Sequence, residues 1–585
     1  MTLSKKYNVI VERNVPATMR DGSILYADVW RPDDSGTFPV LLTRTPYDKS
    51  HPRNATIAGV DPLRSVGEGY VVIYQDVRGR FTSQGNWAFE HEFDDGYDSV
   101  EWAAQLPYSD GNVGMFGISY LGFTQWMAAV ARPPHLRAIF PMQMAGSIRD
   151  FILPGNAFAL GSALYWGAGQ TADALMRRAA SGENIMSSMA GLLAVVDNIP
   201  KAYERLPLQG GNPVISDNFA AFGEWLEHAE DADYWNRISY GHRLHLVDIP
   251  VFHLGSWHDV YSGPVPALFA GMREQGGSQN TRASQKLLMG PWTHGQMASD
   301  VIGDLYMGLS ATSAIVDLAG LHLKWFDHWL KGKSNGFMDE PPVRIYVMGD
   351  NQWRSELEWP LARTVWTKFY LHSGGGANTR GGDGRLDTAA PDTAEPHDSY
   401  VYDPNDPVPT VGGPTVQPGT GVGANAGPKD QARVESRTDV LVYSSSALEK
   451  EIEVTGPITA CIIATSSAVD TDWTVKLVDV HPDGRAYSVA DGICRARYRN
   501  GNERADFLEP GKAYEYEIDL QSTSNVFKVG HRIRVQVSSS NFPRFSRNTN
   551  TGGLIGSETE LKPARQTILH NAEHASFVRL PVIPR

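Results

Sequence analysis

The pattern of hydrophobic positions divides the chain into three parts, of which the first alternates apolar runs with helical segments. GYVVIYQD (69–76) and QKLLMGPWTHG (285–295) are short, continuous apolar runs, whereas DDGYDSVEWAAQL (94–106) has a helical period. Continuous apolar strands are typical of a parallel sheet that helices cover on both faces. The strand–helix–strand order adds right-handed crossover connections. We therefore predict an α/β domain built from residues 1–145 and 243–354.

The other two parts differ from the α/β domain in their periodicity. Residues 146–242 have helical periods and no strong strand, so we predict a helical cap inserted into the α/β domain. Over residues 355–585, short alternating strands such as TDWTVKLVDV and HRIRVQVSSS are separated by Gly, Pro and Asp turns. This pattern is typical of a β-sandwich or jelly roll. Its glycine-rich loops, including 412–428, contain no phosphate-binding motif, so we predict no nucleotide cofactor.

Charge and composition narrow the class of protein. The chain has 66 acidic and 52 basic residues and a formal net charge of −14, which repels nucleic acid and anionic membranes. The residues at the start of the sequence lack the apolar region of a secretory leader, so we expect none, and no run of roughly 18 apolar residues is present for a membrane span. Its two cysteines, Cys461 and Cys494, lack the spacing of a zinc or redox motif. We expect a soluble, cytoplasmic protein that uses no metal; the oligomeric state stays open.

The stretch VGMFGISYLG, residues 113–122, places Ser119 where an apolar strand meets a helix. Gly117 and Gly122 leave room for the helix to pack closely behind that turn, as a nucleophile elbow requires. The usual elbow pattern is G-x-S-x-G, and here Leu121 occupies the second position after the serine. This stretch alone is therefore compatible with a nucleophile or with an ordinary tight turn.

Two residues further along the chain favour the nucleophile. Serine hydrolysis requires a base that accepts the hydroxyl proton and a carboxylate that orients the base. On an α/β-hydrolase sheet the order along the chain is Ser, Asp, His, each after a strand. Asp259 follows the strand PVFHLGS and His294 follows KLLMGP, at the strand ends where α/β sheets bind ligands. We predict that Ser119, Asp259 and His294 form a catalytic triad, which needs no metal to supply a nucleophile.

An oxyanion hole and the remaining histidines complete the candidate chemistry. The backbone N–H of Tyr120 follows the nucleophile directly and is the expected first donor. Tyr47, in the loop after the third strand, is either the second donor, through its phenol, or a packed aromatic residue. His253 is expected in the core, and His258 in a loop that faces away from the pocket or lines it. His322, on the amphipathic helix 314–332, is expected at the surface or at its boundary.

Several motifs together resemble a known family. RTPYDK, QDVRGRFTSQG, DGNVGMFGISYLG, GPWTHG and VQVSSSNFPRFSRNTNTGG are similar to motifs of the bacterial cocaine esterases. These enzymes group with X-prolyl dipeptidyl aminopeptidases and α-amino-acid ester hydrolases. The resemblance implies an α/β-hydrolase domain, a helical cap after the sixth strand and a C-terminal jelly roll. It also implies Ser119 as nucleophile with Asp259 and His294, and an oxyanion hole made by the Tyr47 hydroxyl and the Tyr120 N–H.

The resemblance extends to part of the acyl pocket. Trp166 matches an aromatic cap residue of the esterases, and Leu121 matches the residue beside the nucleophile. Tyr261 stands two residues after the acid, where the esterase has phenylalanine. Loop 412–428 is longer here and has Thr, Val and Gln at 415–417 in place of large apolar residues. The cap contains no clear carboxylate cluster that would bind a free α-amino group. This counts against the X-prolyl dipeptidyl aminopeptidases and the α-amino-acid ester hydrolases.

We therefore predict a cofactor-free serine hydrolase that cleaves carboxylic esters, or amides, of small molecules with an aromatic or compact acyl group. One alternative is an amidase, an X-prolyl dipeptidyl aminopeptidase or an α-amino-acid ester hydrolase. A more remote alternative is a non-catalytic binding protein that uses the jelly roll. The natural substrate stays open, as does the effect of the altered 412–428 loop on acyl specificity.

Overall fold

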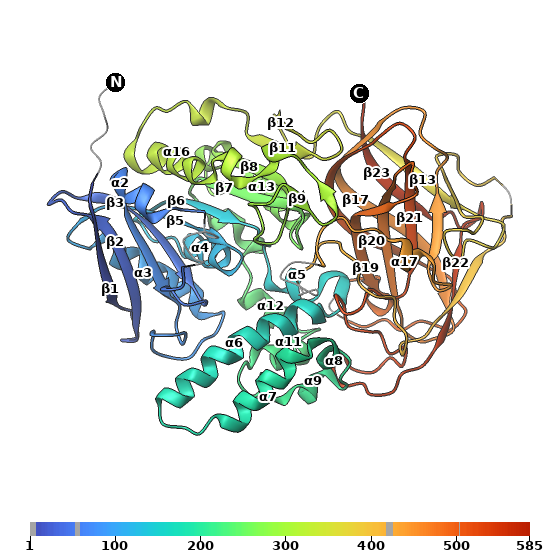
Figure 1. The fold of residues 1–585 in the computed structure, drawn as a ribbon, viewed down its shortest axis with the longest axis horizontal. Helices are drawn as coiled ribbons and strands as arrows, with labels where there is room; N and C mark the ends of the chain where they lie inside the picture. Colours follow the sequence, from blue (N-terminus) through green and yellow to red (C-terminus); the bar gives the residue numbers. More distant parts are fainter. Residues whose placement is uncertain (1–6, 53–58, 393, 417–424, 502–503) are drawn as a thin grey trace.

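The computed structural model describes residues 7–52, 59–392, 394–416, 425–501 and 504–585. Figure 1 shows three parts: an α/β part in blue and yellow-green, a group of teal to green helices below it, and an orange-to-red β part beside both. The α/β part comes from two stretches of the chain, because the helical group lies between β6 and β7 in the sequence. Fold class and order of parts agree with the prediction.

A mixed sheet forms the centre of the α/β part. In spatial order its strands are β1 (Val9–Thr18), β2 (Ile24–Pro32), β4 (Val71–Asp76), β3 (Phe38–Thr45), β5 (Ser109–Ile118), β6 (Leu136–Met142), β7 (Val251–His258), β8 (Gln285–Thr293), β11 (Val343–Val347) and β12 (Gln352–Glu356). The strands from β4 to β11 are parallel, and β1, β2 and β12 add antiparallel margins. Strands β3, β4, β7 and β8 are buried along their whole length, because the sheet is covered on both faces.

The helices of the α/β part follow its strands in the order expected of crossover connections. They are α2 (Pro62–Gly67), α3 (His91–Ala104), α4 (Tyr120–Ala131), α13 (Pro264–Gln275), α14 (Gln279–Ala283), α15 (Ser313–Val316) and α16 (Leu318–Lys331), with the short turns η3 (Leu309–Ala311) and η4 (Phe337–Asp339) and the hairpin β9 (Val301–Ile302) and β10 (Leu305–Tyr306). Helix α4 lies against β5 and β6 and is almost entirely buried. It begins directly after Ser119, so the candidate nucleophile stands at the junction of strand and helix.

The inserted cap is helical throughout its described length. Its elements are α5 (Ile148–Ile152), η1 (Pro154–Asn156), α6 (Leu160–Ala180), α7 (Met186–Asp197), α8 (Ile199–Tyr203), α9 (Leu208–Gly211), α10 (Pro213–Ser216), α11 (Ala221–Glu227), α12 (Ala232–Arg237) and η2 (Gly241–Leu246). The cap is fastened to the β part by backbone hydrogen bonds. The amide of Gly161 donates to the carbonyl of Pro543 at 2.8 Å, and the amide of Ser546 donates to the carbonyl of Phe158 at 2.8 Å.

The C-terminal part is a β structure with its own core. Its strands are β13 (Val365–His372), β14 (Arg385–Asp387), β15 (Asp398–Tyr402), β16 (Leu441–Ser444), β17 (Ile452–Ser466), β18 (Asp472–Val480), β19 (Ala486–Arg495), β20 (Tyr514–Phe527), β21 (Arg532–Ser538), β22 (Ala564–Leu569) and β23 (Phe577–Ile583), with the short helices α17 (Ala432–Glu435) and η5 (Ala496–Tyr498). Buried and half-buried positions alternate along most of β17, as in a strand with one face on the core. That core contains Trp473, Tyr516 and Val535.

The position of His322 differs from the prediction. Instead of lying at the surface or its boundary, its side chain is buried with 1% exposure. Its ring stacks on Phe140 of β6 with 3.8 Å between ring centroids, and its Nδ1 is 2.9 Å from the carbonyl oxygen of Leu318. The prediction was wrong because α16 packs this face of the helix directly onto the sheet, and helical periodicity could not show which face that would be.

The described residues contain no helix that combines the length and the apolar character needed to cross a bilayer.

Candidate active site

Ser119 occupies a strained turn between β5 and α4. Its φ of 57° and ψ of −123° lie outside the regions that an L-residue normally adopts. Such a turn holds the serine side chain away from both flanking elements, as in the elbow of α/β hydrolases. The backbone amide of Ser119 donates to the carbonyl of Met142 in β6 at 2.9 Å, which fixes the turn to the neighbouring strand.

The two glycines around Ser119 are needed for close packing. A Cβ on Gly117, whose φ is +135°, would lie 2.5 Å from the Cβ of Leu121. A Cβ on Gly122 would lie 3.2 Å from the Cβ of Met144. The helix thus approaches the end of β6 closely at Gly122, where a side chain would force its neighbours to shift by a few tenths of an ångström.

His294 and Asp259 form a hydrogen-bonded pair at the ends of β8 and β7. Nδ1 of His294 lies 3.1 Å from each carboxylate oxygen of Asp259. Asp259 is fully buried, whereas the His294 side chain is 20% exposed, so the imidazole is the member of the pair that can meet a substrate. The backbone amide of Tyr261 also donates to Asp259 at 3.2 Å. A carboxylate bonded to Nδ1 leaves Nε2 as the base toward a serine hydroxyl.

Gln143, directly after β6, holds the loop that contains His294. Its Oε1 accepts a hydrogen bond from the amide of Gly295 at 2.8 Å, and its Nε2 donates to the carbonyl of Thr293 at 3.1 Å. Gln143 is fully buried and has a φ of 47°. A role for this residue was not predicted from the sequence. The available signal was a glutamine at the end of the apolar run LRAIFPMQ, where a polar side chain must find partners at the strand ends.

Tyr120 and Tyr47 occupy positions suited to an oxyanion hole. The N–H of Tyr120 is the first of helix α4, and the first amides of a helix have no partner within it. This end of α4 also has the positive pole of the helix dipole. Tyr47 follows β3, is half-buried, and lines the same cavity as Ser119 and His294.

The phenol of Tyr120 points into a buried polar network behind the elbow. It donates to Glu92 at 2.8 Å and accepts from the indole N–H of Trp87 at 3.0 Å. Burial raises the pKa of the Tyr120 phenol well above its usual range. Burial also raises the pKa of Glu92, although the nearby guanidinium of Arg44 acts to lower it. The phenol therefore stays protonated and anchors the first turn of α4 rather than facing a substrate.

A cavity of about 290 Å³ unites these groups. Its wall contains residues of all three parts of the chain: Tyr47, His51, Ile118, Ser119, Tyr120, Leu121, Met144, Tyr261, His294 and Gly295 of the α/β part, Ile148, Phe151, Tyr165 and Trp166 of the cap, and Val416 of the β part. Aromatic and aliphatic side chains predominate in this wall. Phe151 and Tyr165 were not foreseen as cavity residues, because their approach to Ser119 depends on how the cap meets the sheet.

Each predicted pocket residue lies in this wall. Trp166 of α6 stacks on Trp225 of α11 with 5.7 Å between ring centroids and an interplanar angle of 9°. The ring of Tyr261 lies 5.8 Å from that of His294, and burial raises the pKa of its phenol well above the usual range, so it stays neutral. Leu121 is buried with 1% exposure beside the elbow.

Loop 412–428 is described only at its two ends. The amide of Gly413 donates to the carbonyl of Gly427 at 2.8 Å, and the reverse bond is 3.0 Å long, so the two ends pair. Val416 reaches the cavity. Position 417, where glutamine was singled out in the sequence, lies outside the described residues, as do positions 418–424.

Two other histidines occupy the strand that leads to Asp259. His253 is buried with 2% exposure and its Nε2 lies 3.0 Å from Oε1 of Gln285, as expected for a core histidine. His258 ends β7, is also 2% exposed, and lines a different cavity from Ser119. Burial lowers the pKa of each of these histidines to about 4.

Fold and site together define the class of the protein: it is a serine hydrolase with an α/β-hydrolase domain. The profile of the X-Pro dipeptidyl-peptidase (S15 family) matches residues 21–296, and that of the X-Pro dipeptidyl-peptidase C-terminal non-catalytic domain matches residues 335–579. The chain is 38% identical over 585 residues to the cocaine esterase of Rhodococcus sp. (strain MB1 Bresler), with 99% of each chain covered. It therefore belongs to the X-Pro dipeptidyl-peptidase (S15) family and is related over its full length to a cocaine esterase, as the sequence motifs predicted.

Solved structures show the same fold at lower identity. An aminopeptidase from the marine sediment archaeon Thaumarchaeota archaeon has a TM-score of 0.81 and 24% identity, and covers 100% of this chain and 98% of its own. An α-amino acid ester hydrolase has a TM-score of 0.79 and 23% identity, with the same coverage. These two structures extend the likeness in fold across all three parts of the chain.

Proposed function

We propose that this chain hydrolyses carboxylic esters of small molecules through an acyl-enzyme on Ser119. The observation that supports this most strongly is the strained turn of Ser119 in the wall of an apolar cavity that also contains His294. Strain of this kind is maintained where the surrounding structure overrides the local preference, as it does at nucleophile elbows. The bond from His294 to Asp259 supplies the oriented base that such a serine requires.

In the proposed reaction, Nε2 of His294 removes the hydroxyl proton of Ser119 as its Oγ attacks the substrate carbonyl. The N–H of Tyr120 and the hydroxyl of Tyr47 stabilise the resulting oxyanion. His294 then gives the proton to the leaving alcohol, and the carbonyl re-forms as the acyl-enzyme. Water enters, His294 removes a proton from it, and the same steps release the acid and restore the serine. Asp259 stabilises the imidazolium in both halves of the cycle.

The cavity favours a compact, neutral acyl group with aromatic character. Its volume of about 290 Å³ is at the lower end of ligand sites, which span about 300–1,000 Å³. Besides Tyr120, whose phenol bonds to Glu92 behind the elbow, five aromatic residues line it among the described residues: Tyr47, Phe151, Tyr165, Trp166 and Tyr261. Within the described part of the chain no carboxylate lines the cavity, which counts against a clamp for a free α-amino group. The name of the relative from Rhodococcus, a cocaine esterase, is in keeping with this choice.

The experiment that tests the proposal compares the wild-type protein with Ser119→Ala. The wild type should hydrolyse p-nitrophenyl benzoate and take up a fluorophosphonate probe, whereas Ser119→Ala should do neither while keeping its circular dichroism spectrum. Ser181→Ala, which changes an exposed serine at the end of α6, should retain both activities. Retention of probe labelling in Ser119→Ala would contradict the assignment of the nucleophile.

A matched ester and anilide of the same acid separate the esterase from the amidase alternative. We expect kcat/KM for the ester to exceed that for the anilide. X-prolyl p-nitroanilides and α-amino-acid esters should be poorer substrates than p-nitrophenyl benzoate, because no carboxylate among the described lining residues meets their ammonium group. A preference for either of the latter would favour the branch of the family to which that substrate belongs.

We also propose the division into domains and the cellular location. The α/β domain comprises 1–145 and 243–354, with the cap over 146–242 and the jelly roll from 355; β12 continues to Glu356, so the last strand of the central sheet crosses that proposed boundary. A cytoplasmic location is supported by Cys461 and Cys494, which are both free thiols. The net charge of −14 supports small molecules rather than nucleic acid as partners.

A further inference from the structure

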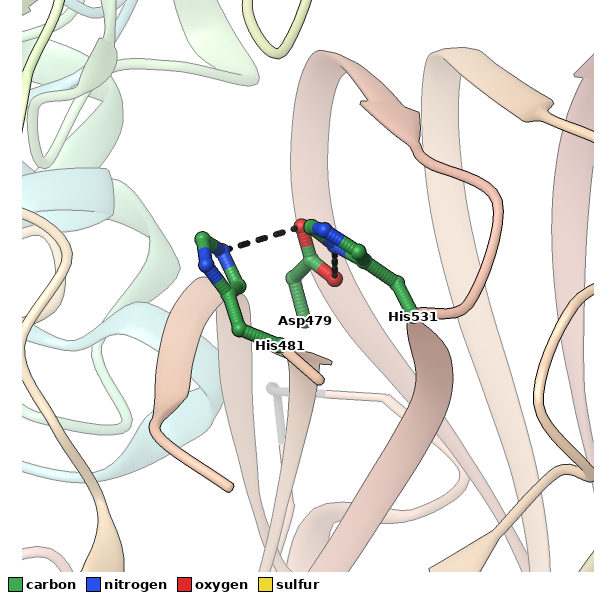
Figure 2. A group of neighbouring side chains, drawn as sticks. All are labelled: Asp479, His481 and His531. Atoms are coloured by element: carbon green, nitrogen blue, oxygen red, sulfur yellow. Dashed lines mark hydrogen bonds and ion pairs between the residues drawn. The ribbon is translucent and has the colours of Figure 1, made fainter. Parts of the chain in front are cut away.

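A carboxylate and two imidazoles meet at one end of β18, beside a cavity other than the one that contains Ser119 and His294. Asp479 is the penultimate residue of this strand, His481 follows it in the turn toward β19, and His531 directly precedes β21. Figure 2 shows the carboxylate of Asp479 between the two rings. One ligand atom from each of the three residues lies within 4.8 Å of the others, and this is the one such group found among the described residues.

The fold creates this group from two distant segments. Asp479 and His481 are two residues apart, which directs their side chains to the same face of an extended chain. His531 is 52 residues beyond Asp479 and reaches it because β18 and β21 pair antiparallel, with Asp479 opposite Ile533. Because His531 is so distant in the chain, the sequence shows no metal-binding spacing here, and the prediction from sequence was that the protein uses no metal.

The distances within the group fit a coordination shell. Nδ1 of His531 is 2.8 Å from Oδ1 of Asp479, and Nε2 of His481 is 3.8 Å from Oδ2. Ligand atoms at about 2.1 Å from a tetrahedral Zn²⁺ are about 3.4 Å from one another. The two observed separations bracket this value, so an ion can enter with small side-chain rotations. The ring centroids of His481 and His531 lie 4.3 Å apart.

The group lines a cavity of about 220 Å³ between the jelly roll and the α/β part. The α/β part contributes, among others, Met307, Met348 and His258. Nε2 of His258 is buried and has no hydrogen-bond partner, although a buried polar atom normally has one. A hydrated ion in this cavity would offer that nitrogen a bound water as a partner.

No positive charge competes with a cation for the Asp479 carboxylate within this cavity wall, as far as the described residues extend. Lys528 is the one lysine or arginine among the lining residues. Its ammonium group bonds to Asp350 at 2.5 Å and to Glu451 at 3.1 Å, and is therefore neutralised by other carboxylates. The side chains of Asp479 and His531 are 11% and 13% exposed, and that of His481 is 25% exposed, so the group is sheltered but has an open side.

We propose that Asp479, His481 and His531 bind a divalent transition-metal ion of the Zn²⁺ type, with water completing its coordination. Two imidazoles and one carboxylate form a nitrogen and oxygen set that suits Zn²⁺ and its neighbours and does not suit Mg²⁺ or Ca²⁺, which prefer oxygen ligands. The ion fastens the turn between β18 and β19 to the segment before β21, at the face where the jelly roll meets the α/β part. This role is structural and independent of the proposed ester hydrolysis.

The test is calorimetric titration of metal-stripped, full-length protein with ZnCl₂. The wild type should bind one Zn²⁺ per chain, show the visible absorption of a low-symmetry site with Co²⁺, and gain thermal stability with Zn²⁺. His481→Ala and Asp479→Asn should each weaken the affinity at least tenfold, since loss of even an outer-shell partner costs about 10–100-fold. Both variants should lose the gain in thermal stability.

Two further variants control for binding elsewhere. His397→Ala removes an exposed histidine of the same β part and should bind Zn²⁺ as the wild type does. His294→Ala removes the catalytic histidine and should also retain the stoichiometry, since binding to the pair of His294 and Asp259 is the competing explanation. The proposal is overturned if the wild type binds no Zn²⁺, if His481→Ala binds as tightly as His397→Ala, or if His294→Ala abolishes binding.

Discussion

Gln143 Oε1 accepts a hydrogen bond from the backbone amide of Gly295 at 2.8 Å, and so the end of β6 holds the loop that carries the base of the proposed triad. The same side chain bonds to the carbonyl of Thr293, so both neighbours of His294 in the chain are fixed by one residue. A histidine that must move protons between three partners needs this restraint, because a misplacement of about 1 Å can cost about 10²-fold in rate.

Replacement of Gln143 should therefore impair chemistry more than binding. We expect Gln143→Ala to lower kcat for p-nitrophenyl benzoate by about 10²-fold with little change in KM. Steady-state kinetics and the rate of fluorophosphonate labelling provide the measurement. Gln209→Ala, a change at a surface glutamine of the cap that bonds to Glu227, is the control and should keep the wild-type kcat. An unchanged kcat in Gln143→Ala would show that the loop holds His294 without this bond.

The hydroxyl of Tyr47 is proposed to donate to the oxyanion, so its loss should reduce the rate of acylation. Tyr47→Phe should lower kcat by about 10²–10³-fold, the usual value of one such donor. Tyr165→Phe is a matched control, because this tyrosine lines the same cavity and is 45% exposed. If both variants have the same kcat, Tyr47 is a packing residue and the second donor lies elsewhere.

Trp166 is expected to select the acyl group through its ring. Trp166→Ala should raise KM for p-nitrophenyl benzoate about tenfold or more and affect p-nitrophenyl acetate less, because only the larger acyl group contacts the indole. Met176→Ala, at a 59% exposed position of the same helix, should leave the ratio of the two kcat/KM values unchanged. Equal losses on both esters would indicate that Trp166 supports the cap rather than the acyl group.

Buried neutral histidines should make the protein sensitive to acid. Burial lowers the pKa of His253 and of His322 to about 4 from 6.5. The unfolded chain therefore binds more protons than the folded one between these pH values, so stability falls as pH decreases from about 6.5 to about 4. Over that range each histidine lowers the free energy of unfolding by about 3 kcal/mol, since one pKa unit corresponds to about 1.4 kcal/mol.

Thermal unfolding followed by circular dichroism from pH 7.5 to pH 4.5 measures this effect. His322→Gln should show a shallower decline of the unfolding midpoint with decreasing pH than the wild type. His397→Gln, at an exposed position, should follow the wild-type curve. A slope that is the same in all three proteins would indicate that carboxylates, not the buried histidines, set the acid limit.

Local chemistry led to the prediction of the triad. Ser119 lies between an apolar strand and a helix, and Asp259 and His294 each follow an apolar strand, so the parallel sheet itself brings their loops to one edge. The positions of Tyr47 and Trp166 in the wall of the same cavity also agree with what the family resemblance implied. Strand ends are a reliable guide because every parallel strand presents its carboxyl end on the same side.

Other features depend on contacts that periodicity does not encode. His322 was misplaced because an amphipathic pattern gives the period of a helix but not the depth of its boundary residues in the core. Gln143 bonds to Thr293 and Gly295, which lie 150 and 152 positions away in the chain, at the end of β8 and the start of the next loop. The cavity wall contributed by Phe151 and Val416 exists only where the cap and the jelly roll meet the sheet.

The sequence by itself determined the class of fold and the order of the three parts, and it indicated the residues proposed for the active site, because these depend on local patterning and on the order of strands. Only the tertiary structure decided which polar groups support His294, how the cavity closes around Ser119, and that Asp479, His481 and His531 form one group. The physical reason is that strand pairing and the packing of separate parts join residues far apart in the chain, and no local spacing records those contacts.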